Sequence, residues 1–168
     1  MNTNAQLQRS VRIRPLEMCD RAQWSDLFRQ YAQFYQSTMS DAILDRSWSW
    51  LMDPHHPIEA LVAESEDMRL LGLAHFRACP DSLIGLDTGF LDDLFVAHDQ
   101  RGSGIGRNLI MGVTAIGQER GWPAVRWITA DANAQARRLY DKLAPVTEWV
   151  TYELCCETVV RDPVMTGP

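Results

Sequence analysis

The sequence predicts an α+β domain in which helices flank one mixed central sheet. Three observations indicate this class. Residues 57–77 have the pattern of a β-hairpin, residues 89–120 form a strand, a glycine-rich turn and a helix, and the other segments follow without repeats or linkers. The length of 168 residues suits one domain, so we predict a single domain over 1–168, with its core at about 10–155 and a loose tail at 157–168.

The first elements are a strand and two helices. Residues 10–15 alternate apolar and polar, as a half-buried strand does. From Asp20 onward, large apolar residues recur at helical spacing, and we expect this stripe to pack mainly into the core, although its rings could also line a substrate pocket. A second helix is expected over 41–52, capped by Ser40 or Asp41. The stripe consists of Trp24, Leu27, Phe28, Tyr31, Phe34 and Tyr35.

The rest of the chain supplies the remaining strands and helices of the predicted domain. The third helix must stop near Gly121, because Pro123 cannot continue it. The predicted order is strands at 57–64 and 70–77, a loop at 78–89, a strand at 89–97, a glycine-rich turn, a helix to Arg120, a strand at 124–130, a helix at 133–143 and a final strand at 147–155.

Composition narrows the possible functions. The net charge of −6 argues against nucleic-acid binding, which needs a surplus of Lys and Arg, and favours a cationic substrate. We expect no membrane partner and a cytoplasmic location, since no apolar run has the length of a membrane span and the start lacks a signal-peptide core. We also expect reduced thiols and no metal. The spacing of the cysteines and histidines fits neither a disulfide framework nor a zinc site; the cysteines are Cys19, Cys79, Cys155 and Cys156, and there are four histidines.

The turn before the third helix is the most informative motif. Glycine alternates with other residues here, so several backbone N–H groups can converge at the positive end of the following helix and hold a pyrophosphate. The dinucleotide fingerprint GxGxxG fails because Arg107 stands at its last position, and no Gly-Lys-Ser/Thr follows as in a P-loop. By its spacing alone, the pattern favours a plain glycine-rich helix entry over a phosphate site. The turn reads Gln100, Arg101, Gly102, Ser103, Gly104, Ile105, Gly106 and Arg107.

Together with its surroundings, this turn resembles motifs A and B of the GNAT (Gcn5-related N-acetyltransferase) superfamily. Arg101-x-x-Gly104-x-Gly106 follows the strand LDDLFVA, and Asn133-x-x-Ala-x-x-Leu-Tyr140 follows 27 residues after Gly106. The segments Leu91 to Val96, Trp127 to Asn133 and Tyr140-Asp141-Lys142 are similar to the Hpa2-like branch of the superfamily. The resemblance covers most of the chain and implies the GNAT fold.

The resemblance implies acetyl-CoA as co-substrate. The amides of Arg101, Gly102, Ser103, Gly104, Ile105 and Gly106 would hold the pyrophosphate, and the strand Leu94, Phe95 and Val96 would pair with the pantetheine arm through its backbone. Arg101 and Arg107 could add charge near the phosphates or be solvated charges at a helix end. Asn133 would contact the cofactor, and a plain helix N-cap suits the same position.

Two residues are the candidate catalytic groups. Tyr140 would protonate the departing CoA thiolate; the alternative is a buried packing role. Asp92 stands where many members of the superfamily carry a glutamate, whose side chain is one methylene longer. Asp92 would therefore take the amine proton directly or through a water molecule, or it would only bind the substrate. Strand alternation predicts Asp92 and Asp93 on opposite faces. A backbone N–H of the strand, that of Val96 or its neighbour, would meet the oxyanion.

These residues favour an N-acetyltransferase that moves an acetyl group to a primary amine of a small molecule, such as a polyamine or amino acid, by direct attack in a ternary complex. Acetylation of a protein lysine or N-terminus is one alternative, and a non-catalytic CoA-binding module is another. The resemblance also implies a homodimer, with Trp149, Val150 and Tyr152 as candidates for the interface or for core packing. After Tyr140 the usual Gly-Phe is replaced by Leu143-Ala144-Pro145.

Overall fold

The structure is a computed structural model that describes residues 11–156. The described chain divides into two compact units, one up to Ala130 and one from Asp131. The predicted single domain over 1–168 therefore stays a prediction, and the predicted loose tail at 157–168 lies outside the described residues.

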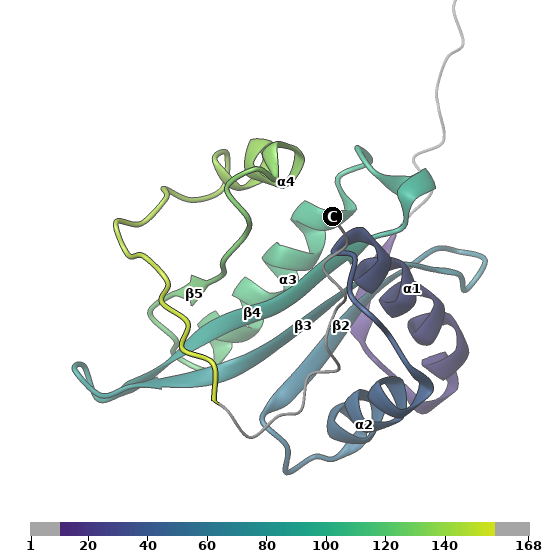
Figure 1. The fold of residues 1–168 in the computed structure, drawn as a ribbon, viewed down its shortest axis with the longest axis horizontal. Helices are drawn as coiled ribbons and strands as arrows, with labels where there is room; N and C mark the ends of the chain where they lie inside the picture. Colours follow the sequence, from purple (N-terminus) through teal and green to yellow (C-terminus); the bar gives the residue numbers. More distant parts are fainter. Residues whose placement is uncertain (1–10, 157–168) are drawn as a thin grey trace, which may run out of the picture. The chain divides into compact units, whose positions relative to one another are not determined.

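The first unit is built on one five-stranded sheet in the order β1-β2-β3-β4-β5 (Figure 1). The first three neighbouring pairs are antiparallel, and β4 and β5 are parallel. The sheet is therefore mixed, as the sequence predicts. The strands are β1 (Arg12–Pro15), β2 (Ile58–Glu64), β3 (Leu70–Asp81), β4 (Leu86–Val96) and β5 (Val125–Arg126).

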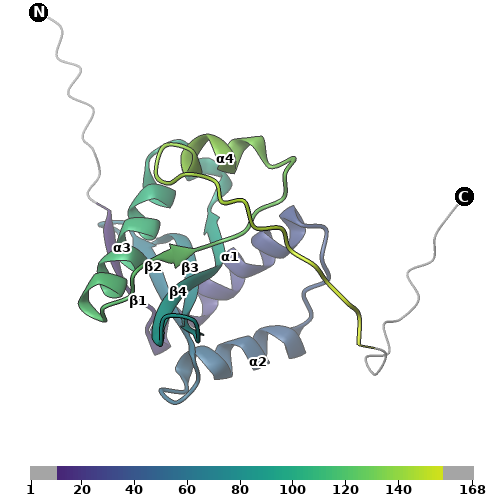
Figure 2. The same ribbon diagram turned by 90° about the vertical axis from the view of Figure 1, so that its left-hand side faces the viewer.

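Helices cover both faces of this sheet. Figure 2 shows α3 on one side of the strands and α1 and α2 on the other. The α+β class predicted from the sequence is confirmed. The helical segments of the first unit are η1 (Met18–Asp20), α1 (Arg21–Phe34), α2 (Asp41–Met52), η2 (His98–Gln100) and α3 (Ile105–Glu119).

The apolar stripe of α1 divides into a buried half and an exposed half. Trp24, Leu27 and Phe28 are buried in a cluster that also contains Trp48 of α2 and apolar side chains of the sheet. At the C-terminal end of the helix, Phe34 is 47% exposed and Tyr35 is 44% exposed. The expected core role is thus confirmed for the first two turns of α1, and the last turn presents aromatic rings to solvent.

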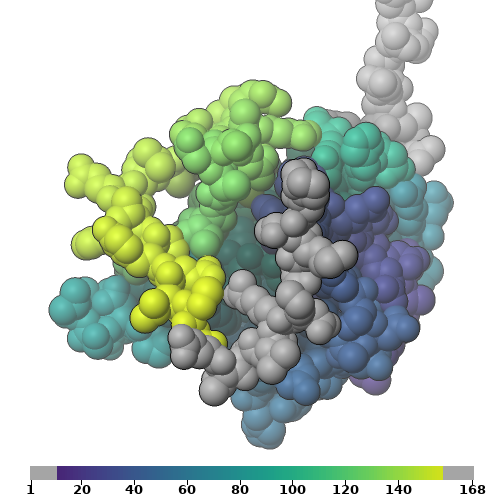
Figure 3. All heavy atoms as spheres, in the orientation of Figure 1, coloured from purple at the N-terminus to yellow at the C-terminus, as the bar shows by residue number. Residues whose placement is uncertain are grey.

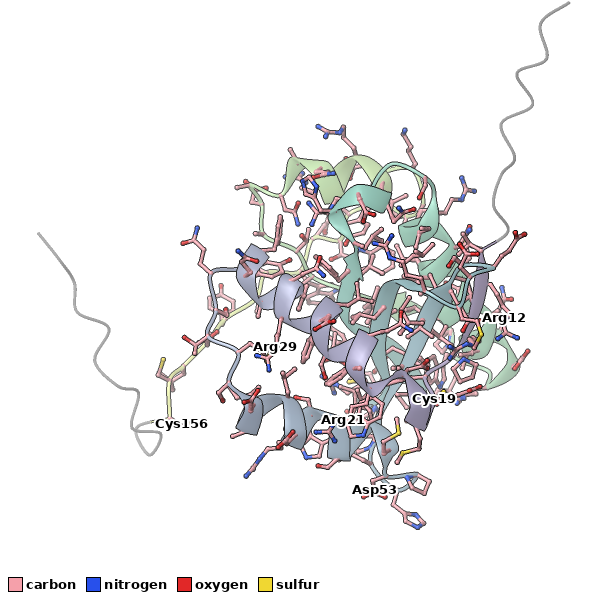
Figure 4. All side chains as sticks on the ribbon, turned by 90° about the vertical axis from the view of Figure 1, so that its right-hand side faces the viewer. Arg12, Cys19, Arg21, Arg29, Asp53 and Cys156 are labelled. Atoms are coloured by element: carbon pink, nitrogen blue, oxygen red, sulfur yellow. The ribbon has the colours of Figure 1, made fainter. Side chains whose placement is uncertain are left out.

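Arginines of α1 tie this helix to α2. Arg21 pairs with Asp45 at 2.5 Å, and Arg29 pairs with Asp41. Both arginine side chains lie between the two helices in Figure 4. The cap of α2 is Ser40, whose Oγ accepts a hydrogen bond from the backbone N–H of Ile43, so of the two capping residues considered from the sequence the serine is used.

Close backbone approach fixes α3 against the other face of the sheet. A Cβ on Gly112 of α3 would lie 3.0 Å from side-chain carbons of both Ile13 and Leu61. A Cβ on Gly89 of β4 would lie 2.6 Å from the ring of Trp122, which follows the helix. Gly89 has no room for a side chain, and at Gly112 a side chain would press against two neighbours, so these glycines permit the contacts between the sheet and the α3 region.

The predicted loop at 78–89 is wrong, because most of it is strand. β3 continues to Asp81 and β4 begins at Leu86, so only residues 82–85 form the turn. Pro80 is accommodated because β2 ends its pairing with β3 at Arg77, and the missing N–H of the proline therefore leaves no ladder bond unmade on that side. Gly85, with φ of +66°, closes the hairpin.

The strand predicted at 124–130 is much shorter, since β5 covers only Val125–Arg126. In the second unit, α4 (Ala134–Tyr140) is a shortened form of the helix predicted at 133–143. The final strand predicted at 147–155 is wrong: these residues have no regular secondary structure, because alternation alone does not make a strand without a neighbouring ladder. Residues 131–156 are the green to yellow atoms of Figure 3.

Candidate active site

The pairing of β3 with β4 shifts by one residue near the middle of β4. His75 pairs with Asp93, while the next residue, Phe76, pairs with Leu91. Asp92 is therefore the extra residue of a β-bulge, opposite no residue of β3. A bulge bends the strand and redirects the side chains beside it.

The bulge brings the two neighbouring aspartates to one face of the sheet. Asp93 contacts His75 and Asp92 contacts Arg77, and these two partners are two residues apart on β3, hence on the same face. This is the face covered by α1, because His75 also bonds Trp24. The predicted separation of Asp92 and Asp93 onto opposite faces is therefore wrong, and the inserted residue is the reason.

Asp92 forms an ion pair that is only partly shielded from water. The Nε–H of Arg77 donates to both carboxylate oxygens, at 3.1 and 3.2 Å, and the guanidinium lies 5.2 Å from the ring centroid of Phe90. Burial raises the pKa of the Asp92 carboxyl, and the hydrogen bond from Arg77 opposes this rise without cancelling it. A carboxylate with a raised pKa is a better proton acceptor at neutral pH than an ordinary aspartate.

Asp93 is held by a buried histidine to which the sequence analysis assigns no role. Its Oδ2 lies 2.8 Å from Nδ1 of His75. The Nε2 atom of His75 accepts a hydrogen bond of 2.9 Å from the indole N–H of Trp24. No spacing in the sequence marks this set, because the three residues come from α1, β3 and β4 and meet only when the sheet forms.

Beyond the bulge, β4 continues without a strand partner on its β5 side. The parallel ladder consists of two residue pairs, Gly89 with Val125 and Phe90 with Arg126. From Leu91 to Val96, no strand among the described residues pairs with that edge. An open edge of this kind can bind an extended ligand through backbone hydrogen bonds. The predicted contact strand of Leu94, Phe95 and Val96 lies along it.

The glycine-rich turn has the backbone geometry that its sequence predicts. Gly102 and Gly104 have φ values of +81° and +88°, and a Cβ on either would meet no neighbouring atom. Backbone conformation rather than space therefore calls for glycine at both positions. Ser103 braces the turn by donating its hydroxyl to the carbonyl of Gln100 at 2.6 Å.

The helix α3 begins directly after this turn, at Ile105. The side chain of Ile105 is buried, whereas Gly102, Ser103 and Gly104 are exposed, so the turn faces solvent while the helix is anchored in the core. The backbone N–H groups of the first helical turn, including that of Gly106, have no carbonyl partner within the helix. Together with the helix dipole they form a site suited to an anion.

The two arginines of the turn have different surroundings. The Nε–H of Arg101 donates to the carbonyl of Val96 at 3.3 Å, and its guanidinium lies over the rings of Phe34 and Phe95, at 5.3 and 5.6 Å from their centroids. Arg101 thus fastens the turn to the end of β4 and to α1. Arg107, on the first turn of α3, is exposed.

In the second unit, Asn133 is the N-cap of α4. Its Oδ1 accepts a hydrogen bond of 3.2 Å from the backbone N–H of Ala136, so the capping role considered from the sequence is confirmed. Tyr140 is the last residue of α4. Both residues therefore belong to one short helix, which places them seven positions apart on a single element.

Three further features of the described chain concern metal ligands, membrane-spanning helices and disulfides. Within residues 11–156 no group of three or more His, Cys, Asp and Glu side chains is arranged to hold a metal ion. Nor does this part of the chain contain a helix both long and apolar enough to cross a bilayer. The four cysteines, all within this part of the chain, form no disulfide in the structure.

Comparison with known proteins identifies the family. A sequence model described as the Acetyltransferase (GNAT) family matches residues 21–144. The chain belongs to the GNAT family. It is therefore an N-acetyltransferase, and enzymes of this family take their acetyl group from acetyl-CoA. The fold and family predicted from the motifs are confirmed.

Individual relatives of this GNAT protein support the assignment. The chain is 30% identical over 142 residues to the D-amino-acid N-acetyltransferase HPA3 of Saccharomyces cerevisiae, covering 84% of this chain and 88% of that protein. The structure matches a ribosomal-protein-alanine N-acetyltransferase from Brucella melitensis biovar Abortus 2308, with a TM-score of 0.75 and 28% identity. The match covers 88% of this chain and 99% of that protein. It also shares its fold with the aminoglycoside N-acetyltransferase AAC(6')-Iy solved with CoA, with a TM-score of 0.71 and 20% identity. This match covers 88% of this chain and 96% of that protein.

Proposed function

We propose that the substrate of this N-acetyltransferase is a primary amine of a small molecule, such as an amino acid or a polyamine. The observation that carries the proposal is the pair of carboxylates at the β4 bulge, both on one face and both partly accessible. Carboxylates attract the ammonium form of an amine. The relative HPA3 is a D-amino-acid N-acetyltransferase, which makes amino acids a substrate class to test first.

The described residues fit acetyl-CoA. The exposed turn with two positive-φ glycines, followed by the N-terminus of α3, suits the pyrophosphate. The open edge of β4 suits the amide groups of the pantetheine arm, which would extend the sheet as a strand does. We assign the grip on the phosphates to Arg101 through Arg107 and the contact with pantetheine to Leu94, Phe95 and Val96. Asn133 is proposed as a further cofactor contact.

The chemistry we propose is direct transfer. The amine nitrogen attacks the thioester carbonyl carbon, the bond between carbon and sulfur breaks, and the thiolate leaves. Tyr140 protonates that thiolate, and Asp92 takes the proton lost by the amine, directly or through water. The raised pKa of Asp92 supports this role. A backbone N–H of β4, that of Val96 or its neighbour, would stabilise the oxyanion.

Thiol release tests the proposal. Acetyl-CoA is incubated with the protein and with a panel that includes D-alanine, L-alanine and spermidine, and free thiol is measured over time. We expect at least one of these amines to accelerate release strongly. If none does so while acetyl-CoA binds tightly, the small-amine substrate is wrong.

Tyr140→Phe separates catalysis from cofactor binding. We expect kcat to fall by about 100-fold, the low end for loss of a general acid, with an unchanged Kd for acetyl-CoA. Unchanged turnover would contradict the general-acid role and favour packing. Tyr152→Phe is the matched control, because it removes a phenol hydroxyl from a largely exposed tyrosine of the same unit.

A protein N-terminus is the second candidate substrate. The structural match to a ribosomal-protein-alanine N-acetyltransferase favours it, at 28% identity. Short peptides with N-terminal alanine, added to the same thiol-release assay, decide between the two. A peptide whose kcat/KM exceeds that of D-alanine and spermidine by 100-fold or more would favour the protein substrate.

We also propose a homodimer, in a cytoplasmic protein. Its supporting observation is the apolar surface carried by the residues where the sequence predicts a strand: Trp149, Val150, Tyr152 and Leu154 are each more than two-thirds exposed. An alternating apolar segment of this kind can pair with the same segment of a second copy. Sedimentation should give twice the 19.1 kDa mass of the chain, and Trp149→Asp with Tyr152→Asp should give the monomer.

A further inference from the structure

A hydrogen-bonded chain of three side chains runs through the core to the bulge of β4. The indole N–H of Trp24 donates to Nε2 of His75 at 2.9 Å, and Nδ1 of His75 lies 2.8 Å from Oδ2 of Asp93. Trp24 is fully buried and His75 is 1% exposed. Neither residue has a part in the proposed chemistry, although a buried imidazole needs both of its nitrogen atoms satisfied.

The indole determines the protonation state of the histidine. An indole N–H can only donate, so Nε2 of His75 is the acceptor and carries no proton. The proton of the neutral ring is then on Nδ1, which donates it to Asp93. The edge contact with Phe28, at 4.9 Å between ring centroids, helps to fix the plane of the imidazole. His75 is therefore a neutral hydrogen-bond donor with one tautomer.

The groups around His75 leave one negative charge uncompensated. Trp24 and Phe28 face the ring from α1, and Ala60 of β2 pairs with His75 in the sheet. The charged groups nearby are Asp92 and Asp93 of β4 and Arg77 of β3. Arg77 pairs with Asp92. The partner of Asp93 is the neutral imidazole, so the cluster carries a net charge of about −1.

Asp93 is anchored on one side and accessible on the other. Its side chain is 22% exposed, whereas that of His75 is 2% exposed. Oδ2 is engaged by the imidazole. The contact with the imidazole uses Oδ2 only, which leaves the other oxygen, Oδ1, available for a further contact. A rigidly held carboxylate oxygen is thus presented beside Asp92.

We propose that Asp93 binds the ammonium group of the substrate and that Trp24 and His75 are positioning residues for it. This inference rests on the proposed function and deepens it. The two carboxylates then have separate roles: Asp93 holds the cation, and Asp92 takes the proton that the amine loses. Because the imidazole has its proton on Nδ1 and its other nitrogen engaged, the proton cannot pass inward through His75.

The test is Asp93→Asn in the full chain, with acetyl-CoA saturating and D-alanine and spermidine as the amine probes. We expect the KM for the amine to rise by about 10- to 100-fold, the range for loss of a charge-assisted hydrogen bond, with kcat within about threefold. The KM for acetyl-CoA should not change. Asp87→Asn, an exposed aspartate on the same strand, is the matched control and should leave the amine KM unchanged.

Two substitutions of His75 test positioning. The amide nitrogen of His75→Asn can still donate to Asp93, whereas His75→Leu cannot. We expect His75→Leu to raise the amine KM as Asp93→Asn does, and His75→Asn to stay within about threefold of the parental protein. An equal KM in the two variants overturns the positioning role, and thermal melting verifies that both fold.

Trp24→Phe gives a second readout. It leaves Nε2 of His75 without its hydrogen-bond donor, so the imidazole is no longer held in one tautomer and the pH profile of kcat/KM for the amine should change. An unchanged pH profile contradicts the role of Trp24. If no amine accelerates thiol release by the parental protein, the proposed function itself fails; if the parental protein is active and Asp93→Asn leaves the amine KM unchanged, only this inference fails.

Discussion

Two clusters of arginine and carboxylate side chains lie on the same sheet, and their environments differ. At the β1 end, Arg14 donates to Asp20 at 2.7 Å and to Glu64 at 2.5 Å. At the β4 bulge, Arg77 pairs with Asp92 at 3.1 Å. Arg14 is only 10% exposed, whereas Arg77 is 39% exposed. Similar residues thus form a closed cluster in one place and an open one in the other.

The pKa directions follow this difference. Hydrogen bonds from Arg14 lower the pKa of Asp20, and those from Arg14 and Arg12 lower the pKa of Glu64 to about 2. At the bulge, burial raises the pKa of Asp92 because a single arginine nitrogen does not offset the loss of water. A carboxylate that is desolvated but incompletely paired thus has a raised pKa, whereas one whose pairing is complete has a lowered pKa and stabilises the fold.

Breaking the closed cluster should have the largest effect. Arg14→Leu leaves Asp20 and Glu64 buried without their shared cation, so the free energy of unfolding should fall by about 3–5 kcal/mol. Urea unfolding measures it. The matched control is Arg12→Leu, which removes a cation from the same Glu64 but whose side chain is 70% exposed, and it should cost at most about 1 kcal/mol. Equal losses would contradict the closed nature of the cluster.

Asp92→Asn tests the open cluster. The kcat should fall by about 10²- to 10⁴-fold, since the carboxylate can no longer take the amine proton. The fold should not lose stability at pH 7: the pKa of Asp92 is raised in the folded protein, so its ionised form disfavours folding and its removal does no harm. Steady-state kinetics and thermal melting measure both. A large loss of stability with little change in kcat would make Asp92 structural.

Acid should unfold the protein through the closed cluster. Because the pKa of Glu64 is lowered from 4.5 to about 2 and that of Asp20 is lowered as well, the stability they contribute is present above about pH 4.5 and is lost as the pH falls toward 2. Melting temperature measured against pH should show this decline. Arg14→Leu should flatten the decline, and a parallel curve for the variant would refute the assignment.

The smallest effect is expected at the glycine turn. Gly104→Ala places a side chain at φ of +88°, which should cost about 1–2 kcal/mol and raise the KM for acetyl-CoA by disturbing the start of α3. Gly85→Ala, at φ of +66° in the β3–β4 hairpin, is the matched control. It should show a similar loss of stability with an unchanged KM. A raised KM in both variants would mean that the effect is not local to the turn.

Much of the fold could be predicted because its signals are local. The helix at 41–52, the hairpin strands ending at Glu64 and starting at Leu70, and the positive-φ glycines before α3 follow from periodicity and turn chemistry. The strand at 147–155 could not be predicted correctly, since alternation states only which face would be apolar. Whether such a segment becomes a strand depends on a ladder partner.

The family, the glycine turn and the candidate residues Asp92, Asn133 and Tyr140 could be predicted from residue type and spacing along the chain. That Asp92 and Asp93 share a face could not be predicted, since the bulge is a property of the pairing between β3 and β4 in the folded protein. The pairing of Asp93 with a buried His75, and of His75 with Trp24, is likewise decided in the folded protein. His75 and Asp93 are 18 positions apart and Trp24 and His75 are 51 positions apart, so these contacts leave no local pattern in the sequence. They form because α1 packs over the sheet and excludes water from these polar groups, which must then bond one another.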